Sequence, residues 1–309
     1  MVYAHAPVMA QEVMELLRPE AQRKYLDGTL GGGGHSEKIL ELSSPDGMVL
    51  GLDWDEEAVA AARQRLERFG DRLVVRRANF REARGILQQL GWGRVDGVLL
   101  DLGLSSHHVE SAERGFSFHA QARLDMRMDR RRTLDASEVV NSFSVSELAR
   151  ILREYGEEPR ARQIALAIDA QRKRGRIANT KELAQLVVRV AGRKRGRIHP
   201  ATKTFQALRI AVNRELENLE GFLEDAYELL RSNGRMVVIS FHSLEDRLVK
   251  QAFRKWSRSC ICPPKTPICR CGWSQQVKLL TSRPRLPSHA ELEHNPRARS
   301  AKLRAVERL

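Results

Sequence analysis

Cysteine is absent from this 309-residue chain before residue 260, and all four cysteines lie between Cys260 and Cys271. Cysteines confined to so short a segment exclude the disulfide framework that stabilises many secreted proteins. No apolar run reaches the roughly 18 residues that a membrane-spanning helix needs, and the N-terminal residues lack the basic and apolar regions of a signal peptide. These absences predict a soluble, cytoplasmic protein that has no membrane partner.

Acidic residues are scarce relative to basic ones. The chain has 39 Asp and Glu against 53 Lys and Arg, which gives a formal net charge of +14. Such an excess favours a polyanionic partner, and nucleic acid is the main candidate. The hydrophobic content of 42% is nevertheless enough for a buried core, so we expect one large or two smaller globular domains rather than a disordered chain.

Strand and helix patterns alternate in the N-terminal third of the chain. A helical stripe over residues 58–66, for example, separates two strand-like runs. This alternation predicts βαβ units and a parallel sheet. The strand-like runs lie at residues 25–26, 48–53, 73–75 and 95–101.

The sheet pattern stops and resumes near the C-terminus. Residues 219–230 carry a helical stripe, which we expect Asn233 and Gly234 to terminate before a buried strand at 236–239. The irregular C-terminal segment ends with a predicted pair of closing strands. These two strands lie at residues 277–280 and 302–306.

Between these two parts the strand patterns vanish and helix-start signals recur. Ser144 with Glu147, for instance, has the spacing of a capping box. We therefore predict a helical insertion domain at 111–210 for RNA recognition, within a discontinuous core formed by 1–110 and 211–309. Basic runs in the insertion are either solvated faces or phosphate contacts. They lie at residues 130–132, 172–174 and 193–195.

The most distinctive stretch is a run of four glycines at residues 31–34, which follows an apolar segment and precedes a helical pattern. Glycine has no Cβ, so such a turn can take positive φ and let a ligand lie against main-chain N–H groups at the positive end of the helix. An ordinary flexible loop is the alternative.

Acidic residues flank the glycines at informative distances. Asp53 ends the second predicted strand, 20 residues after Gly33, where nucleotide-binding folds place an acid on the ribose hydroxyls. Asp53 or Asp55 could equally begin the next helix. Asp27, before the glycines, suits a methionine ammonium group or caps the turn. An NAD site shares this geometry, but its fingerprint needs a third glycine where the chain has Ser36.

Two further side chains fall at the same predicted sheet edge. Phe80 follows the third strand, where it either stacks on an adenine or fills the core. Asp101 ends the fourth strand, at the position where ligands meet reactants in such folds. We take Asp101 as the candidate reactive-centre residue, with a turn or cap acid as the alternative.

Seven multi-residue blocks stand out along the chain: DGTLGGGGHS at 27–36, DLGLSS at 101–106, ERGFSF at 113–118, LDMRM at 124–128, KTFQALR at 203–209, NREL at 213–216 and SFHSLEDR at 240–247. Together they closely resemble the MraW/RsmH family of 16S ribosomal RNA cytosine-N4 methyltransferases. The resemblance implies an α/β fold, a class I (Rossmann-like) methyltransferase core with an inserted all-helical domain. It also implies S-adenosylmethionine as the methyl donor and, as acceptor, the cytosine at position 1402 in the decoding site of the small ribosomal subunit.

The resemblance also assigns residues to the cofactor, namely Gly33, Gly34, His35, Asp53, Phe80, Asp101 and His108. At His108 the chain departs from the family pattern, because many members have Pro-Gln where this chain has His107 and His108. An imidazole can still donate or accept a hydrogen bond there.

Methylation of an exocyclic amine needs an in-line approach and an acceptor for the departing proton, but no covalent nucleophile. The absence of cysteine before Cys260 agrees with this requirement. Asp101 is the candidate catalytic residue, and the backbone of Ser105 and Ser106 is the alternative holder of the amine. His242, after the late strand, either contacts the target base or caps the next helix.

The cysteine cluster is a weak candidate for a metal site. Its single-residue spacings are tighter than the usual zinc spacing, so we predict no metal and keep reduced cysteines or a local disulfide as alternatives. The candidate ligands are Cys260, Cys262, Cys269 and Cys271.

Two other classes of protein remain as rivals to the methyltransferase. A non-catalytic RNA- or ribosome-binding module would bind RNA without affinity for the methyl donor. An NAD-dependent dehydrogenase would require the third fingerprint glycine that Ser36 replaces. The sequence leaves the oligomeric state open, with a homodimer as one option.

Overall fold

The computed structural model describes the chain except residues 1–6, 105–111, 193–198, 264–265 and 267. The chain forms two compact units, the first made of Met1–Gly103 and Glu217–Leu309 and the second of Leu104–Leu216. Within the part of the chain that is described, none of the helices combines the length and the apolar content needed to cross a membrane.

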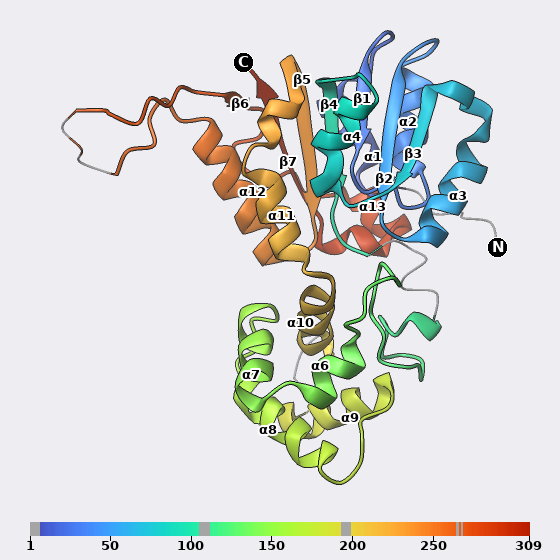
Figure 1. Ribbon diagram of the computed structural model, residues 1–309, viewed down its shortest axis with the longest axis vertical. Coiled ribbons are helices and arrows are strands. Elements are labelled where there is room, and N and C mark those ends of the chain that lie inside the picture. The colour runs from blue at the N-terminus through green and yellow to red at the C-terminus, as the bar shows by residue number, and fades with distance from the viewer. Residues whose placement is uncertain (1–6, 105–111, 193–198, 264–265, 267) are drawn as a thin grey trace. The chain divides into compact units, whose positions relative to one another are not determined.

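The first unit is built around a seven-stranded sheet in the order β3-β2-β1-β4-β5-β7-β6 (Figure 1). Strands β1 to β5 run parallel, whereas β7 is antiparallel to both of its neighbours. This mixed sheet confirms the predicted Rossmann-like α/β fold class and the positions of the predicted strands. The strands are β1 Lys24–Asp27, β2 Met48–Asp53, β3 Leu73–Arg77, β4 Val95–Asp101, β5 Leu230–Ser240, β6 Val277–Leu279 and β7 Lys302–Arg308.

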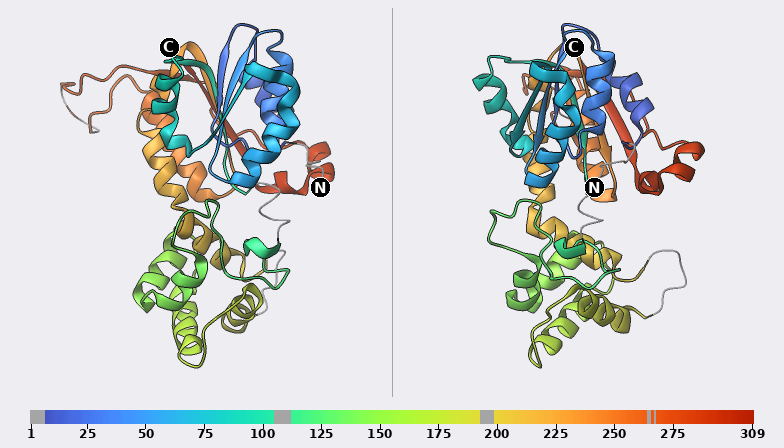
Figure 2. Two further views of the ribbon diagram at one scale, coloured as in Figure 1. Left: turned by 45° about the vertical axis from the view of Figure 1, so that its right-hand side comes forward. Right: turned by 90° about the vertical axis from the view of Figure 1, so that its right-hand side faces the viewer.

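Helices flank both faces of this sheet (Figure 2). They are α1 Ala10–Leu17, α2 Gly34–Leu42, α3 Glu56–Leu66, α4 Ala83–Gln89, α11 Glu215–Leu223, α12 Ser243–Trp256 and α13 His289–His294. Successive residues of the central strands point to opposite faces, so Leu99 packs with α1 and α2, whereas Leu100 packs with α4, α11 and α12. Burial on both faces explains why these strands are almost continuously apolar in the sequence.

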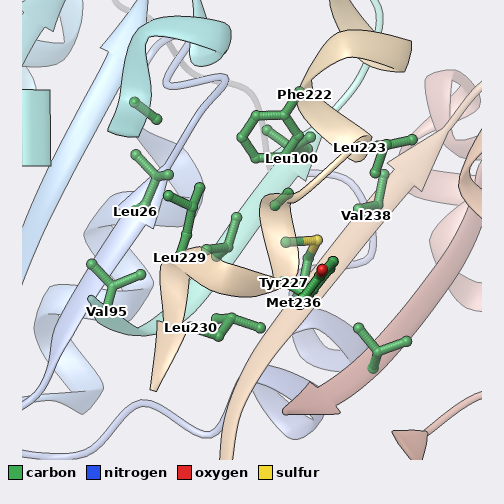
Figure 3. Packing of buried hydrophobic residues seen from close by; sticks show 14 of the residues in the cluster. Leu26, Val95, Leu100, Phe222, Leu223, Tyr227, Leu229, Leu230, Met236 and Val238 are labelled. Atoms are coloured by element: carbon green, nitrogen blue, oxygen red, sulfur yellow. The ribbon is translucent and has the colours of Figure 1, made fainter. Parts of the chain in front are cut away.

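Figure 3 shows the second of these apolar layers from close by. Leu26 of β1, Leu100 of β4 and Met236 of β5 lie on one face of the sheet in the same cluster as Phe222 of α11, and all four side chains are at most 5% exposed. Each fully buried side chain of this size contributes about 1.5–3 kcal/mol relative to exposure. The layer therefore fixes β1 and β4 side by side, which places the ends of these two strands together.

The predicted helix end at Asn233 and Gly234 is wrong. α11 ends at Leu223, a 3₁₀ helix covers Ala226–Leu229, and β5 already begins at Leu230. Asn233 has a φ of 64°, and the register of β5 against β4 shifts at this point. Asn and Gly tolerate left-handed backbone at helix ends and at strand irregularities alike, so the dipeptide does not distinguish the two.

The second unit is helical, with one isolated bridge between Arg123 and Asn179 as its strand-like pairing among the described residues. The predicted capping box is confirmed, since Ser144 and Glu147 bond reciprocally at the start of α7. Three consecutive helices pack in sequence, α7 on α8 and α8 on α9, and α10 returns to α7. The helices are α6 Ala136–Ser142, α7 Val145–Glu154, α8 Ala161–Arg172, α9 Thr180–Ala191 and α10 Thr202–Asn213.

Candidate functional site

Three aspartates lie at the carboxyl edge of the sheet. Asp27, Asp53 and Asp101 are the last residues of β1, β2 and β4. The strand order reverses between the neighbours β1 and β4, because the chain runs from β1 outward through β2 and β3 and then returns to β4 on the other side. Open α/β sheets bind ligands at such a reversal, outside the carboxyl ends of the strands.

Asp53 orders the glycine turn that follows β1. Its carboxylate accepts the N–H of Gly31 at 2.8 Å through Oδ2 and the N–H of Asp55 at 2.9 Å through Oδ1. Asp55, not Asp53, caps helix α3, since its side chain accepts the N–H of Glu57. Of the two acids that could begin this helix, the structure therefore selects Asp55.

Gly33 requires the conformation that only glycine takes easily. Its φ is 80°, and it is the N-terminal cap of α2, a nine-residue helix that begins at Gly34. A Cβ on Gly33 would lie 2.8 Å from Cδ1 of Leu66, which is fully buried. The turn thus brings the positive end of α2 to the sheet edge with no side chain at Gly33 to cover it.

Asp27 is a buried acid with two local partners. Only 1% of the residue is exposed, Oδ1 accepts the Thr29 N–H at 3.2 Å, and Oδ2 accepts the Ser36 hydroxyl at 2.7 Å. The predicted turn-capping role is therefore present. Burial is the largest influence and raises the pKa of Asp27 to about 6, although the bond from Ser36 and the nearby His35 act in the opposite direction.

The raised pKa of Asp27 predicts a pH-dependent cost in stability. The folded state binds the proton more tightly than the unfolded state, so stability falls as pH rises from about 4 to about 6, by about 3 kcal/mol. Asp27→Asn removes this titration. The variant is expected to gain about 2 kcal/mol relative to wild type in urea unfolding curves between pH 4 and pH 7, the part of this total that falls within that range.

The matched control is Asp46→Asn, which removes one acidic side chain from an exposed position in the same unit. Comparing each variant with wild type at the same pH cancels the titration of all other groups. A difference between Asp27→Asn and wild type that stays constant from pH 4 to pH 7 would contradict the prediction.

The side chains of His35 and Asp101 lie next to each other without a hydrogen bond between them. His35 is 6% exposed, and its Nε2 lies 3.5 Å from Oδ2 of Asp101. Within the described part of the chain, neither ring nitrogen of His35 nor Oδ1 of Asp101 has a hydrogen-bond partner. Buried polar atoms without partners are costly, about 1–3 kcal/mol each, and are rare in folded proteins unless a ligand or water satisfies them.

The strand end that carries Asp101 is itself held in place by the glycine turn. The backbone N–H of Asp101 donates to Oγ1 of Thr29 at 2.6 Å, and the N–H of Gly28 donates to Leu99 O at 2.9 Å. Thr29 and Ser36 were not predicted as site residues. The signal was present, because a hydroxyl residue two positions after a strand-end acid is typical of a side-chain turn.

Phe80 adopts its predicted core role in part. Its ring meets Phe222 edge-on with centroids 5.3 Å apart, and it packs against the apolar layer while remaining partly exposed. His242 likewise adopts its predicted capping role, since Nδ1 accepts the N–H of Glu245 at the start of α12. His108, Ser105 and Ser106 lie outside the described residues.

The second unit contains a separate pocket of about 560 Å³. Phe118 stacks on His199 there, with ring centroids 4.5 Å apart and planes 23° from parallel. The lining combines aromatic rings with cationic side chains, and none of its described residues is acidic, which suits a nucleobase and its phosphate. The lining residues are Phe118, His119, Lys181, Ala184, Gln185, Val188, Arg189 and His199.

Arginines from two of the basic runs form ion pairs and hydrogen bonds with other residues of the second unit. Arg131 pairs with Asp129 at 2.8 Å, and Arg132 donates to the Asn213 carbonyl at 3.1 Å. Arg172 pairs with Asp169 at 2.8 Å and donates to the carbonyl of Phe143. The third run, at 193–195, lies outside the described residues. Sequence alone does not distinguish such internal arginines from phosphate ligands.

Comparison with known proteins gives full-length matches. The model of the MraW methylase family matches residues 2–309. Ribosomal RNA small subunit methyltransferase H of Thermomicrobium roseum is 52% identical over 99% of this chain and 94% of its own. The protein of that name from Syntrophotalea carbinolica is 51% identical over 100% of this chain and 99% of its own. The one from Geobacter sulfurreducens is 51% identical over the whole of both chains.

Proposed function

The chain belongs to the MraW methylase family, and from this premise we propose that it methylates ribosomal RNA of the small subunit with S-adenosylmethionine as donor. The family predicted from the sequence is thereby confirmed. The observation that carries the proposal is the identity of about half of all residues, over the full length, to enzymes named ribosomal RNA small subunit methyltransferase H. We further propose N4 of the cytosine at position 1402 of 16S ribosomal RNA as the acceptor, on the strength of the sequence blocks described above.

The residues at the sheet edge fit the donor. S-adenosylmethionine, when bound, supplies an electrophilic methyl group on a sulfonium. The buried carboxyl of Asp27 suits the ammonium group, and Asp53 stands where an acid accepts ribose hydroxyls. The polar atoms of His35 and Asp101 that lack a partner among the described residues are further groups that a polar ligand would satisfy.

We assign the remaining cofactor contacts to residues beside these acids. Gly33 and Gly34 let the ligand approach the backbone at the start of α2. The exposed part of Phe80 would lie against the adenine, and His108 completes the set predicted from the family resemblance.

In the proposed reaction, Asp101 holds the exocyclic amine and takes up its proton as the new bond forms. Oδ1 of Asp101 has no hydrogen-bond partner among the described residues, and Thr29 fixes the backbone beside it. A positioned acceptor of this kind contributes about 10²- to 10⁴-fold to a rate. The enzyme supplies orientation and charge rather than a covalent intermediate.

RNA recognition is assigned to the second unit. Its pocket offers the Phe118 and His199 rings for stacking and the Lys181 and Arg189 side chains for phosphate. A cytosine within structured RNA must be unstacked before its amine can react. The RNA substrate is proposed to be part of the small ribosomal subunit, which implies a cytoplasmic location. A homodimer stays a prediction from the sequence.

The deciding experiment transfers labelled methyl groups to small ribosomal subunits that lack the modification, and then maps the labelled nucleotide. We expect label on a single cytosine, at N4. Subunits that already carry the modification are the matched control and should accept no label.

Three results would contradict the proposed function. Label on adenine or on a pyrimidine carbon would overturn the acceptor. RNA binding without calorimetric affinity for S-adenosylmethionine would favour a non-catalytic RNA-binding module, whereas affinity for NADH would favour the dehydrogenase.

A further inference from the structure

All four cysteines gather in the segment between α12, which ends at Trp256, and β6, which begins at Val277. They are free thiols, and their sulfur atoms all lie within 4.8 Å of one another. Cys260 Sγ lies 3.4 Å from Cys269 Sγ and 3.7 Å from Cys271 Sγ, Cys269 Sγ lies 3.5 Å from Cys271 Sγ, and Cys262 Sγ lies 4.0 Å from Cys269 Sγ. Two Cys-x-Cys pairs thus meet face to face.

These separations are those of a tetrahedral thiolate site. Zinc–sulfur bonds of about 2.3 Å in a tetrahedron put neighbouring sulfurs about 3.8 Å apart. The observed 3.4–4.0 Å lies around this value, whereas a disulfide requires about 2.05 Å. The single-residue spacing that argued against a metal in the sequence is therefore compatible with one, because both members of each pair reach the same point.

The segment has no apolar core of its own. None of the described residues of 257–276 is buried, and Ile268 is 69% exposed. Ordering a residue costs about 1–2 kcal/mol of backbone entropy, and small units without a core commonly offset this cost with a metal. A metal bound where the four thiols converge would supply such a stabilising contact.

The base of the segment is already closed by hydrogen bonds. The N–H of Gln276 donates to Trp256 O at 2.8 Å, and Nε1 of Trp273 donates to Arg258 O at 3.1 Å. The next cross-connection outward is the cysteine cluster. The N–H of Cys262 also donates to Cys260 Sγ at 3.4 Å, which fixes the position of that sulfur relative to the Cys262 backbone.

We propose that Cys260, Cys262, Cys269 and Cys271 bind one structural Zn²⁺ ion. Each thiol gives up its proton on binding, so four protons are released and no electron is transferred. Four protein ligands complete a tetrahedron and leave no position open for water or substrate, which makes the site structural rather than catalytic. The ion would cross-link the segment further from the sheet than the hydrogen bonds of Gln276 and Trp273 that close its base.

The first test needs no variant. Full-length protein is purified under reducing conditions without a metal-affinity step, incubated with zinc, dialysed and analysed for metal. We expect about one equivalent of zinc per chain, and a tetrahedral thiolate spectrum when cobalt replaces zinc. Less than about a tenth of an equivalent, a stoichiometric disulfide by mass spectrometry, or iron in place of zinc after purification would each overturn the proposal.

A second test locates the ion. Cys260→Ser with Cys271→Ser is expected to lose at least about nine-tenths of the bound zinc, and Thr266→Ala, in the same exposed segment, is expected to retain it. Chelation of wild-type protein should accelerate tryptic cleavage after the exposed Arg270 and leave the rate unchanged in the double variant. Zinc retained in full by the double variant would place the ion elsewhere and overturn the proposal.

Discussion

Asp101→Asn is expected to slow methyl transfer by at least about 10²-fold at saturating donor and RNA. The amide keeps the size of the side chain but is neutral and cannot take up the amine proton. Stability should change by no more than about 1 kcal/mol, because among the described residues the side chain makes no hydrogen bond that the substitution breaks, and its ionic contact to His35 is 3.5 Å long. Single-turnover transfer of labelled methyl measures the rate, and urea unfolding measures the stability.

The matched control lies on the same strand. Asp96→Asn makes the same change at the opposite end of β4, where Asp96 accepts the N–H of Lys24. An amide oxygen can still accept this bond, so we expect methyl transfer at close to the wild-type rate. An unchanged rate in Asp101→Asn would remove Asp101 from the mechanism. A loss confined to donor affinity, measured by calorimetry, would make Asp101 a cofactor ligand only.

The core of the fold could be predicted from the sequence because its signals are local. Strands buried on both faces read as apolar runs, and amphipathic stripes mark the helices between them. The capping box at Ser144 and Glu147 is likewise complete within four residues. Asp53 and Asp101 could be placed at one sheet edge because the carboxyl ends of parallel strands must meet there.

The details of the site could not be predicted, because they depend on residues far apart in the chain. The bond from Gly31 to Asp53, the bond from Asp101 to Thr29 and the contact between His35 and Asp101 each join residues that no local pattern connects. Asn233 shows the converse failure. Its local signal is real, but pairing of β5 with β4 decides whether the irregularity ends a helix or interrupts a strand.

Gly33→Ala is expected to weaken donor binding by at least about tenfold and to lower the free energy of unfolding by about 1–3 kcal/mol. A φ of 80° is unfavourable for alanine, and the new Cβ would meet Cδ1 of the buried Leu66 at 2.8 Å. The turn must therefore shift, and with it the N-terminus of α2 and the loop that Asp53 holds. Calorimetric titration with S-adenosylmethionine and urea unfolding measure the two effects.

Gly85→Ala is the matched control. Gly85 lies inside α4, and a Cβ there would have no described heavy atom outside its own helix backbone within 4 Å. Alanine is favoured over glycine at such a position by about 1 kcal/mol, so stability should rise while donor affinity stays unchanged. Adding Leu66→Ala to Gly33→Ala relieves the contact but not the φ strain. If this second change restores donor affinity, the loss is caused by the contact with Leu66. If affinity stays low, the loss is caused by the backbone strain of the turn. Wild-type affinity in Gly33→Ala alone would show that donor binding does not depend on this turn.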